Sequence, residues 1–331
     1  MSVGVASILN PRTGAEASET LLAPERGTWI DLWRAFRRDR FAMTGLVLVV
    51  FMCLLALFAP VVAHLVGHGP NQTFDFMVNG QGLPLGPSRS FLFGGDQVGR
   101  DVFVRTVYGA RTSLTVALVS AVSATIFGTL VGTVAGYYGG GADIVLSRIT
   151  DVFLSIPVLL FAISISTVAS VTAAGALDGL LKPGIGLVTA VIAFFSWPYV
   201  ARIVRGQVIA LREREFVQAA ESLGASDFRI MWHELLPNLV SPILVYLTLI
   251  VPSNVLFEAA LSYFGLGVPQ STPSWGQMLA DATNNSLFTY AWWMMLFPGL
   301  FLFVTMLAFN LVGDGLRDAF DRITGATVGG R

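Results

Sequence analysis

The sequence has few of the residue types from which catalytic and metal sites are built. Its one cysteine, Cys53, excludes an internal disulfide. Its one lysine, Lys182, is followed by proline, whereas the phosphate-binding loop of ATPases requires Ser or Thr after the lysine. Three histidines do not favour a histidine metal cluster, and Pro237 stands where a zinc-protease motif beginning at His233 needs its second histidine. We therefore expect no catalytic residue, no metal and no cofactor bound by this chain.

Charge is also scarce. Of the 331 residues, 12% are charged and 54% are hydrophobic, and the mean hydropathy is +0.69. These values are typical of an integral membrane protein. The net charge of −1 gives no reason to expect a nucleic-acid partner.

Charged side chains are absent from six long stretches, each near or above the length of a membrane helix. They cover residues 41–63, 112–142, 152–177, 183–201, 235–257 and 282–313. We therefore predict an all-α polytopic membrane protein with six transmembrane helices, the first over 41–66 and the other five within a core at 112–314. The third is expected over 152–177, the fourth over about 186–204 and the fifth over about 239–260. The lack of ionisable groups in these runs disfavours a proton-coupled carrier.

The amino-terminal segment, residues 1–40, is polar, and its last part has an amphipathic pattern. Five apolar residues there predict a short helix on the membrane surface: Trp29, Ile30, Leu32, Trp33 and Phe36. Arg37, Arg38 and Arg40 precede the first apolar run. A twin-arginine signal is rejected because that run is long enough to span and further spans follow.

The basic residues predict the orientation of the chain. With both termini in the cytoplasm, fifteen arginines lie on the cytoplasmic side, and four arginines and Lys182 lie outside. This orientation predicts extracytoplasmic loops at 67–111 and 262–290 and a cytoplasmic tail at 315–331.

One polar segment, Arg202–Asn238, separates two of the apolar runs. Phe216, Ala219, Ala220 and Leu223 recur at helical spacing, which predicts one apolar face of a helix. Gly224 is a suitable helix stop, Ser226 or Asp227 can cap a second short helix, and Pro237 fits the first turn of the next span. The segment is either a solvated loop or a docking element for a soluble partner.

Two further patterns concern packing and the first outer loop. Gly128, Gly132 and Gly136 are four residues apart, which permits close approach of a neighbouring helix; we favour a neighbour within this chain over a dimer seam. The outer loop contains a polar motif whose residues are Asp96, Gly99, Arg100, Asp101 and Arg111. Taken alone, Asp96, Arg100 and Asp101 are as compatible with a structural ion-pair cluster as with a functional motif.

Four blocks of sequence resemble the permease subunits of bacterial ABC importers. Residues 216–238 resemble the loop by which such permeases contact their ATPase, with matches at Ala219, Ala220, Gly224, Leu236 and Pro237. Gln218 replaces the usual Glu, which removes a charge and keeps the size. Residues 93–114, 258–281 and 308–321 resemble motifs of the C-type permease of dipeptide, oligopeptide and nickel importers, with Gly95 in place of the usual Thr.

The resemblance implies a type I ABC importer permease fold (MetI-like) in a bacterial inner membrane. It implies a second homologous permease chain, two P-loop ATPase subunits that hold ATP and Mg, an extracytoplasmic substrate-binding protein and membrane lipid as partners. The expected cargo is a di- or oligopeptide, with nickel chelates or glutathione as alternatives. Coupling to the ATPase is expected through the segment 205–236, within which the candidate residues are Phe216, Gln218, Ala219, Ala220, Leu223, Gly224 and Asp227, with Leu236 and Pro237 directly at its end.

Two other classes of function were weighed against this one. A stand-alone channel or secondary transporter would make the polar segment an ordinary loop. A membrane-embedded enzyme would need a constellation of catalytic residues, and the sequence offers none.

Overall fold

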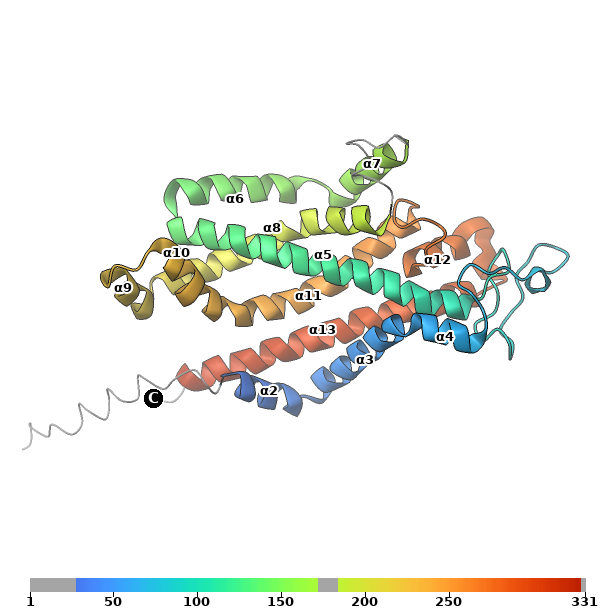
Figure 1. Ribbon diagram of the computed structural model, residues 1–331, viewed down its shortest axis with the longest axis horizontal. Coiled ribbons are helices and arrows are strands. Elements are labelled where there is room, and N and C mark those ends of the chain that lie inside the picture. The colour runs from blue at the N-terminus through green and yellow to red at the C-terminus, as the bar shows by residue number, and fades with distance from the viewer. Residues whose placement is uncertain (1–27, 172–183, 329–331) are drawn as a thin grey trace, which may run out of the picture.

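Helices make up most of the described part of the chain. The computed structural model describes residues 28–171 and 184–328. Five long helices run along its long axis (Figure 1): α3 (Arg40–Leu57), α5 (Val102–Tyr138), α8 (Ile185–Arg212), α11 (Leu236–Tyr263) and α13 (Trp293–Val328). The shorter helices are α2 (Thr28–Arg38), α4 (Ala59–Val66), α6 (Gly140–Ser155), α7 (Val158–Val171), α9 (Glu215–Ser222), α10 (Asp227–Arg229) and α12 (Trp275–Thr283). In these residues extended backbone pairs only at isolated bridges, all within residues 73–101.

The prediction of a helical membrane protein is confirmed. Five helical stretches are long and apolar enough to cross a membrane: Arg40–Leu57, Val102–Tyr138, Ile185–Arg212, Asp227–Tyr263 and Trp293–Arg322. The pair Gly140–Ser155 and Val158–Ser164, which is bent by 77°, makes a sixth span if the two helices are counted as one broken span. Within the range 152–177 predicted for the third span, the helix is broken between Ser155 and Val158. Pro157 lies at the break, where it has no N–H to continue the helix, and residues 172–177 lie outside the described part.

The first two spans also differ from the predicted boundaries. The range 41–66 is divided between α3 and α4 at Phe58, since Pro60 lies in the first turn of α4. The second span begins at Val102 and not after Thr112, so the outer loop is shorter than 67–111. Its start is set by Asp101, whose side chain accepts hydrogen bonds from the N–H groups of Phe103 (2.8 Å) and Val104 (3.3 Å).

Three boundaries differ in the second half of the chain. Helix α8 continues past the predicted end of the fourth span to Arg212. The predicted loop 262–290 contains α12 and a 3₁₀ turn, η3 (Asn284–Thr289), and α13 begins only at Trp293. The predicted tail 315–331 is helical as far as Val328. Side-chain packing explains the helices in the predicted loop and in the predicted tail. Trp275 of α12 is fully buried, and Ala319 of α13 is buried against α2.

Helices α5 and α8 make the most extensive contact in the bundle. Each glycine of the α5 stripe lies against α8: a Cβ added at Gly128 would be 2.6 Å from Val200 Cβ, and one added at Gly136 would be 2.8 Å from Val208 Cβ. At Gly132 it would lie 2.5 Å from the carbonyl oxygen of Ala201. The stripe therefore faces a helix of the same chain, and any side chain there would force the two backbones apart.

The amphipathic helix expected near the amino terminus is present as α2. It lies beside α13 (Figure 1). Leu32 and Phe36 are buried against α13, and Ile30 and Trp33 are exposed. The side chain of Trp29 lies outside the described part. Helix α2 therefore packs on the bundle with one face and leaves the other uncovered.

We expect Gly132→Ala to destabilise the protein and Gly141→Ala to have little effect. Both changes add one methyl group within a helix, but a Cβ at Gly141 meets nothing within 4 Å. Overpacking of this kind costs about 1–3 kcal/mol. Thermal unfolding of the two purified variants in detergent measures the difference. Equal midpoints for both would show that the α5–α8 seam can widen freely.

Candidate functional site

The predicted coupling segment, residues 205–236, forms one end of the bundle (Figure 1). Helix α8 extends into it as far as Arg212, and α9 follows after two residues. Ser226 then caps α10, with its hydroxyl accepting from the N–H of Arg229 at 3.4 Å. A π-helical stretch, η2 (Ile230–Leu235), leads into α11, which has Pro237 in its first turn. The segment is thus a helix, a turn and a helix between two spans.

Gly224 makes the turn between α9 and α10. Its φ of +81° lies in the left-handed region that side chains disfavour. The N–H of Gly224 donates to the carbonyl of Glu221 (2.9 Å), and the N–H of Ala225 donates to that of Ala220 (3.0 Å). This pair of bonds is the Schellman motif, which ends a helix by satisfying its last carbonyls. The glycine is therefore required for its backbone conformation, since a Cβ there would meet nothing within 4 Å.

One side chain fixes α9 to the bundle. Val217 is fully buried in a cluster with Val208 of α8, Ile230 and Leu235 of η2, and Leu239 of α11. Burying a valine side chain contributes about 1.5–3 kcal/mol. The predicted pattern of Phe216, Ala219, Ala220 and Leu223 did not include Val217. Ala220 of that pattern packs against the same cluster. The coupling segment is consequently held to two spans at once.

Polar contacts add a third attachment, to the end of α5. Arg212 Nη1 donates to the backbone carbonyl of Tyr137 (2.7 Å) in the last turn of α5, where carbonyl groups lack a partner within the helix. The Tyr137 hydroxyl donates to Asp227 Oδ1 of α10 (3.2 Å). Movement of α9 and α10 would therefore be transmitted to α5, α8 and α11 together.

The predicted apolar face of α9 is turned to solvent. Leu223 is 88% exposed, Phe216 is exposed, and Ala220 is half-buried. Two aromatic residues that sequence analysis did not single out, Phe228 (65% exposed) and Trp232 (44% exposed), lie beside each other with ring centroids 5.8 Å apart. We call Phe216, Leu223, Phe228 and Trp232 the apolar patch. Large exposed apolar side chains gathered on an anchored element are typical of a protein-interaction site.

The remaining predicted residues of the segment lie around the apolar patch. Gln218 and Ala219 are exposed, and Gln218 Nε2 donates to the carbonyl of Glu213 at 3.3 Å. Leu236 is half-buried and Pro237 is exposed at the start of α11. Gln218 thus makes only a local contact within the chain.

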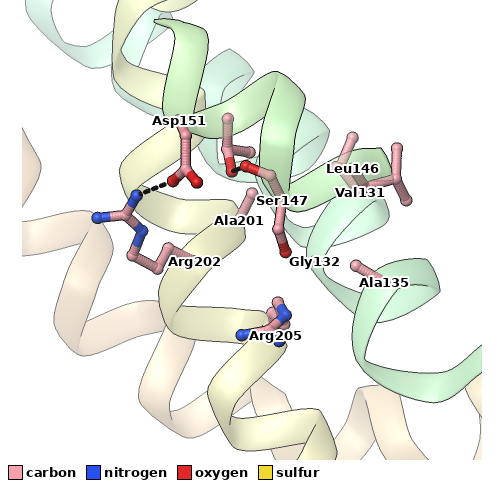
Figure 2. Close-up of a pocket in the computed structure, with 10 residues that line it drawn as sticks. Val131, Gly132, Ala135, Leu146, Ser147, Asp151, Ala201, Arg202 and Arg205 are labelled. Carbon is pink, nitrogen blue, oxygen red and sulfur yellow. Dashed lines mark hydrogen bonds and ion pairs between the residues drawn. The ribbon is translucent and has the colours of Figure 1, made fainter. Parts of the chain in front are cut away.

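Next to the coupling segment, two ion pairs join α6 to α8 around a cavity of about 390 Å³. Asp151 pairs with Arg202 at 2.6 Å (Figure 2), and Asp143 pairs with Arg205 through two contacts, of which Nη2–Oδ2 is 2.6 Å. Both arginines belong to the charged segment recognised in the sequence. They hold the first half of the bent span against the helix that leads into α9.

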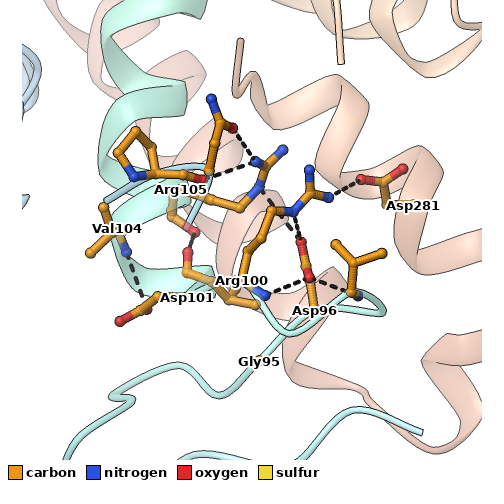
Figure 3. A network of polar contacts seen from close by, with 12 residues as sticks. Gly95, Asp96, Arg100, Asp101, Val104, Arg105 and Asp281 are labelled. Atoms are coloured by element: carbon orange, nitrogen blue, oxygen red, sulfur yellow. Dashed lines mark hydrogen bonds and ion pairs between the residues drawn. The ribbon is translucent and has the colours of Figure 1, made fainter. Parts of the chain in front are cut away.

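At the opposite end of the molecule, the outer-loop motif forms a buried charge network (Figure 3). Arg100 Nε lies 2.5 Å from Asp96 Oδ2, and Arg100 Nη2 lies 3.5 Å from Asp281 Oδ2 of α12. Arg105, which sequence analysis missed, is 1% exposed and lies 3.7 Å from Asp96. Burial raises the pKa of Asp281, and the guanidinium groups of Arg100 and Arg105 oppose that shift. The two carboxylates and two guanidiniums balance, as buried charges require.

The other residues of that motif have separate roles. Asp101 caps α5 and also lies 2.6 Å from His68 Nδ1. Gly99, at φ +80°, would bring a Cβ against the carbonyl oxygen of Phe74. Arg111 is exposed on α5, and no ion pair links it to any residue of the described chain. The motif therefore contains a structural network and one isolated arginine.

Glu258 of α11 is an ionisable residue inside a span. It is fully buried, and its carboxylate oxygens accept hydrogen bonds from Ser113 (2.6 Å) and Ser262 (2.7 Å). Its hydrogen bonds join α5 and α11 beside Trp275, whose indole N–H donates to the carbonyl of Thr106. Within residues 28–171 and 184–328, no group of three His, Cys, Asp or Glu side chains could hold a metal ion.

Comparison with known proteins gives two matching families. Residues 128–324 match the family described as binding-protein-dependent transport system inner membrane component. Residues 27–81 match the N-terminal transmembrane domain of oligopeptide transport permease C. Together these matches cover α2 to α4, and then the chain from the last part of α5 to near the end of α13.

Relatives match over nearly the whole chain. The dipeptide transport system permease protein DppC of Bacillus subtilis (strain 168) is 37% identical over 95% of this chain and 91% of its own. The oligopeptide transport system permease protein OppC of the same organism is 37% identical over 88% and 89%. The glutathione transport system permease protein GsiD of Escherichia coli O157:H7 is 38% identical over 89% and 91%.

The fold is also found in a solved structure. A chain of the MetNI methionine ABC transporter in an inward-facing conformation aligns with a TM-score of 0.50 and 20% identity, over 68% of this chain and 95% of that one. The membrane-spanning helices of the structure and the two family matches point to the same kind of protein. This chain is a multi-pass bacterial inner-membrane protein that belongs to the binding-protein-dependent transport system inner membrane component family of ABC importer permeases.

Proposed function

We propose that this chain is one of two homologous permease subunits of an ATP-driven, binding-protein-dependent importer for di- or oligopeptides. One observation carries the proposal: the apolar patch is exposed on a segment that is fixed to α5, α8 and α11. An ordinary solvated loop has no need of such anchoring. The patch is the surface on which a P-loop ATPase subunit docks.

The mechanism follows from the three attachments of the coupling segment. ATP and Mg bind to the two partner ATPases, and closure of these subunits moves α9 and α10. Val217 and the Tyr137–Asp227 hydrogen bond transfer this movement to the spans. The Arg202 and Arg205 ion pairs carry α6 along with α8. The spans then alternate between openings on the two sides of the membrane, which requires that the partners bind the two states differently.

The orientation of the chain is proposed on the same grounds. Helix α2, the coupling segment and the far end of α13 lie at one end of the bundle (Figure 1). If ATPases dock there, both termini are cytoplasmic. The charge network around Asp96 and Arg100 then faces the opposite side, where an extracytoplasmic binding protein delivers the cargo. Balanced and buried, this network gives that side a rigid edge.

The cargo is proposed from the names of the relatives. Dipeptide and oligopeptide permeases are each 37% identical to this chain, and a glutathione permease is 38% identical. These values do not separate the three cargos, so glutathione import is the alternative, followed by nickel chelates. Stand-alone, ion-coupled transport through this chain has weaker support. Such carriers use ionisable groups within their spans, and both carboxylate oxygens of Glu258 already accept hydrogen bonds from Ser113 and Ser262.

We expect Leu223→Asp to abolish binding of the ATPase subunits and peptide uptake without unfolding the permease. Leu223 is 88% exposed, so its replacement changes stability by no more than about 0.5 kcal/mol. Co-purification of the ATPases and uptake of a labelled dipeptide measure the effect. Leu92→Asp, a matched change at an exposed leucine of the outer loop, should retain the ATPases. Normal ATPase recovery with Leu223→Asp would contradict the proposed docking surface.

Gly224→Val should abolish uptake, whereas Gly224→Asn should retain most of it. The left-handed conformation costs an ordinary residue about 1–2 kcal/mol, and asparagine is the side chain that tolerates it best at a helix end. Both variants should insert normally, because the site lies outside the spans. Transport rates normalised to the amount of inserted protein compare them. Equal activity of the valine and asparagine variants would rule out a role for this turn.

Tyr137→Phe should lower the amount of peptide imported per ATP hydrolysed. The change removes the hydrogen bond to Asp227 and keeps the ring, at a cost of about 0.5–1.5 kcal/mol. Tyr138→Phe is the matched control, since Tyr138 is exposed and donates no hydrogen bond in the described structure. Uptake and ATP hydrolysis measured together in proteoliposomes give the ratio. An unchanged ratio would mean that this link does not transmit movement.

A further inference from the structure

Helix α2 has two faces, and the bundle accounts for only one of them. On the inner face, Phe36 packs against α13 at Gly315, where an added Cβ would lie 3.2 Å from the Phe36 ring. Leu32 is buried beside it. The outer face shows Ile30 and Trp33, which are 56% and 51% exposed. The inner face therefore fixes the position of α2 on the bundle, and the outer apolar face is free to contact another molecule.

The outer apolar face continues into a membrane span. Phe41, in the first turn of α3, is 74% exposed, and α3 is long and apolar enough to cross a membrane. The start of this span lies at the boundary between hydrocarbon and headgroups. Aromatic side chains are enriched at that depth, where one end of the ring is apolar and the other is wet. Trp33 and Phe41 are thus exposed aromatic side chains near the start of a membrane-spanning helix.

Three arginines at the same boundary have no partner. Arg37, Arg38 and Arg40 are exposed, and none of them forms an ion pair with any residue in the described part of the chain. The carboxylates of α2 and of the link to α3 already have other partners. Asp31 pairs with Arg34 at 3.2 Å, and Asp39 accepts from the N–H groups at the start of α3.

Helix α13 packs against α2, and its charged residues do not neutralise this cluster. Asp314, Arg317 and Asp318 are exposed there. No ion pair joins them to α2 or α3 among residues 28–57. The cluster is thus a local excess of positive charge that is held beside an exposed apolar face.

We propose that Arg37, Arg38 and Arg40, together with Trp33 and Phe41, form a binding site for the headgroup of an anionic phospholipid. Guanidinium groups bind phosphate oxygens with good geometry. The neighbouring aromatic rings contact the upper acyl chains, which favours a lipid over an acidic protein segment. This site is independent of the proposed docking surface, because it lies on α2 and α3 and not on the coupling segment. It fixes α2 at the membrane surface.

The first test uses the unaltered permease, purified in a mild detergent. Phosphatidylglycerol, phosphatidylcholine or inorganic phosphate is added, and the midpoint of thermal unfolding is measured. We expect phosphatidylglycerol alone to raise the midpoint, because the site requires both the anionic headgroup and the acyl chains. Lipid extracted from the purified protein should be enriched in anionic species. Equal shifts with phosphatidylcholine, or an equal shift with inorganic phosphate, would overturn the proposal.

Variants then locate the site. Arg37→Gln/Arg38→Gln should lose most of the phosphatidylglycerol-dependent shift, and Arg37→Lys/Arg38→Lys should keep a large part of it. Arg89→Gln/Arg148→Gln removes the same charge from exposed positions elsewhere and should respond like the unaltered protein. All four proteins are compared without lipid first, so that a general loss of stability is seen separately. A glutamine variant that still prefers phosphatidylglycerol, or a control variant that loses the preference equally, would contradict a site at α2.

Discussion

Close backbone approach between α5 and α8 determines where the rest of the chain lies. Gly128, Gly132 and Gly136 bring the two helices together over the second half of α5, so that α8 leaves the bundle alongside the last turn of α5. In a membrane there is no hydrophobic driving force between helices, and association depends on close packing and hydrogen bonds. The seam therefore places Arg212 next to the Tyr137 carbonyl. The coupling segment takes its position from that contact.

The two ends of the bundle are built differently. At the proposed cytoplasmic end, the coupling segment is attached by the buried Val217 of α9 and by the hydrogen bonds of Arg212 and Asp227 to Tyr137, and its apolar patch remains exposed. At the other end, Asp96, Arg100 and Asp281 are buried in a balanced network beside the capped start of α5. The anchored segment can pass movement from a partner to the spans, and a buried charge network resists opening because its charges would be left unpaired. This asymmetry suits a transporter whose conformational change is driven by partner subunits at one end.

The sequence predicted the fold well where periodicity and helix punctuation were decisive. The charge-free runs identified the spans, and the Gly224 stop, the Ser226 cap and Pro237 have the conformations expected of them. It failed where a helix extends into polar sequence, as at Val102, because the capping by Asp101 is not an apolar signal. It also missed Val217 and Arg105. A single buried residue on an amphipathic helix, or an arginine paired with residues distant in sequence, is fixed by tertiary contacts that no local pattern reports.

The central claim is that the apolar patch contacts an ATPase. The most direct measurement places a photo-activated cross-linking residue at position 223 and, as a control, at position 92, in native membranes. Illumination followed by mass spectrometry identifies what is covalently attached. The account predicts a P-loop ATPase attached at position 223 and none at position 92. Attachment of lipid alone at position 223, or of no protein in membranes where uptake is active, would contradict it.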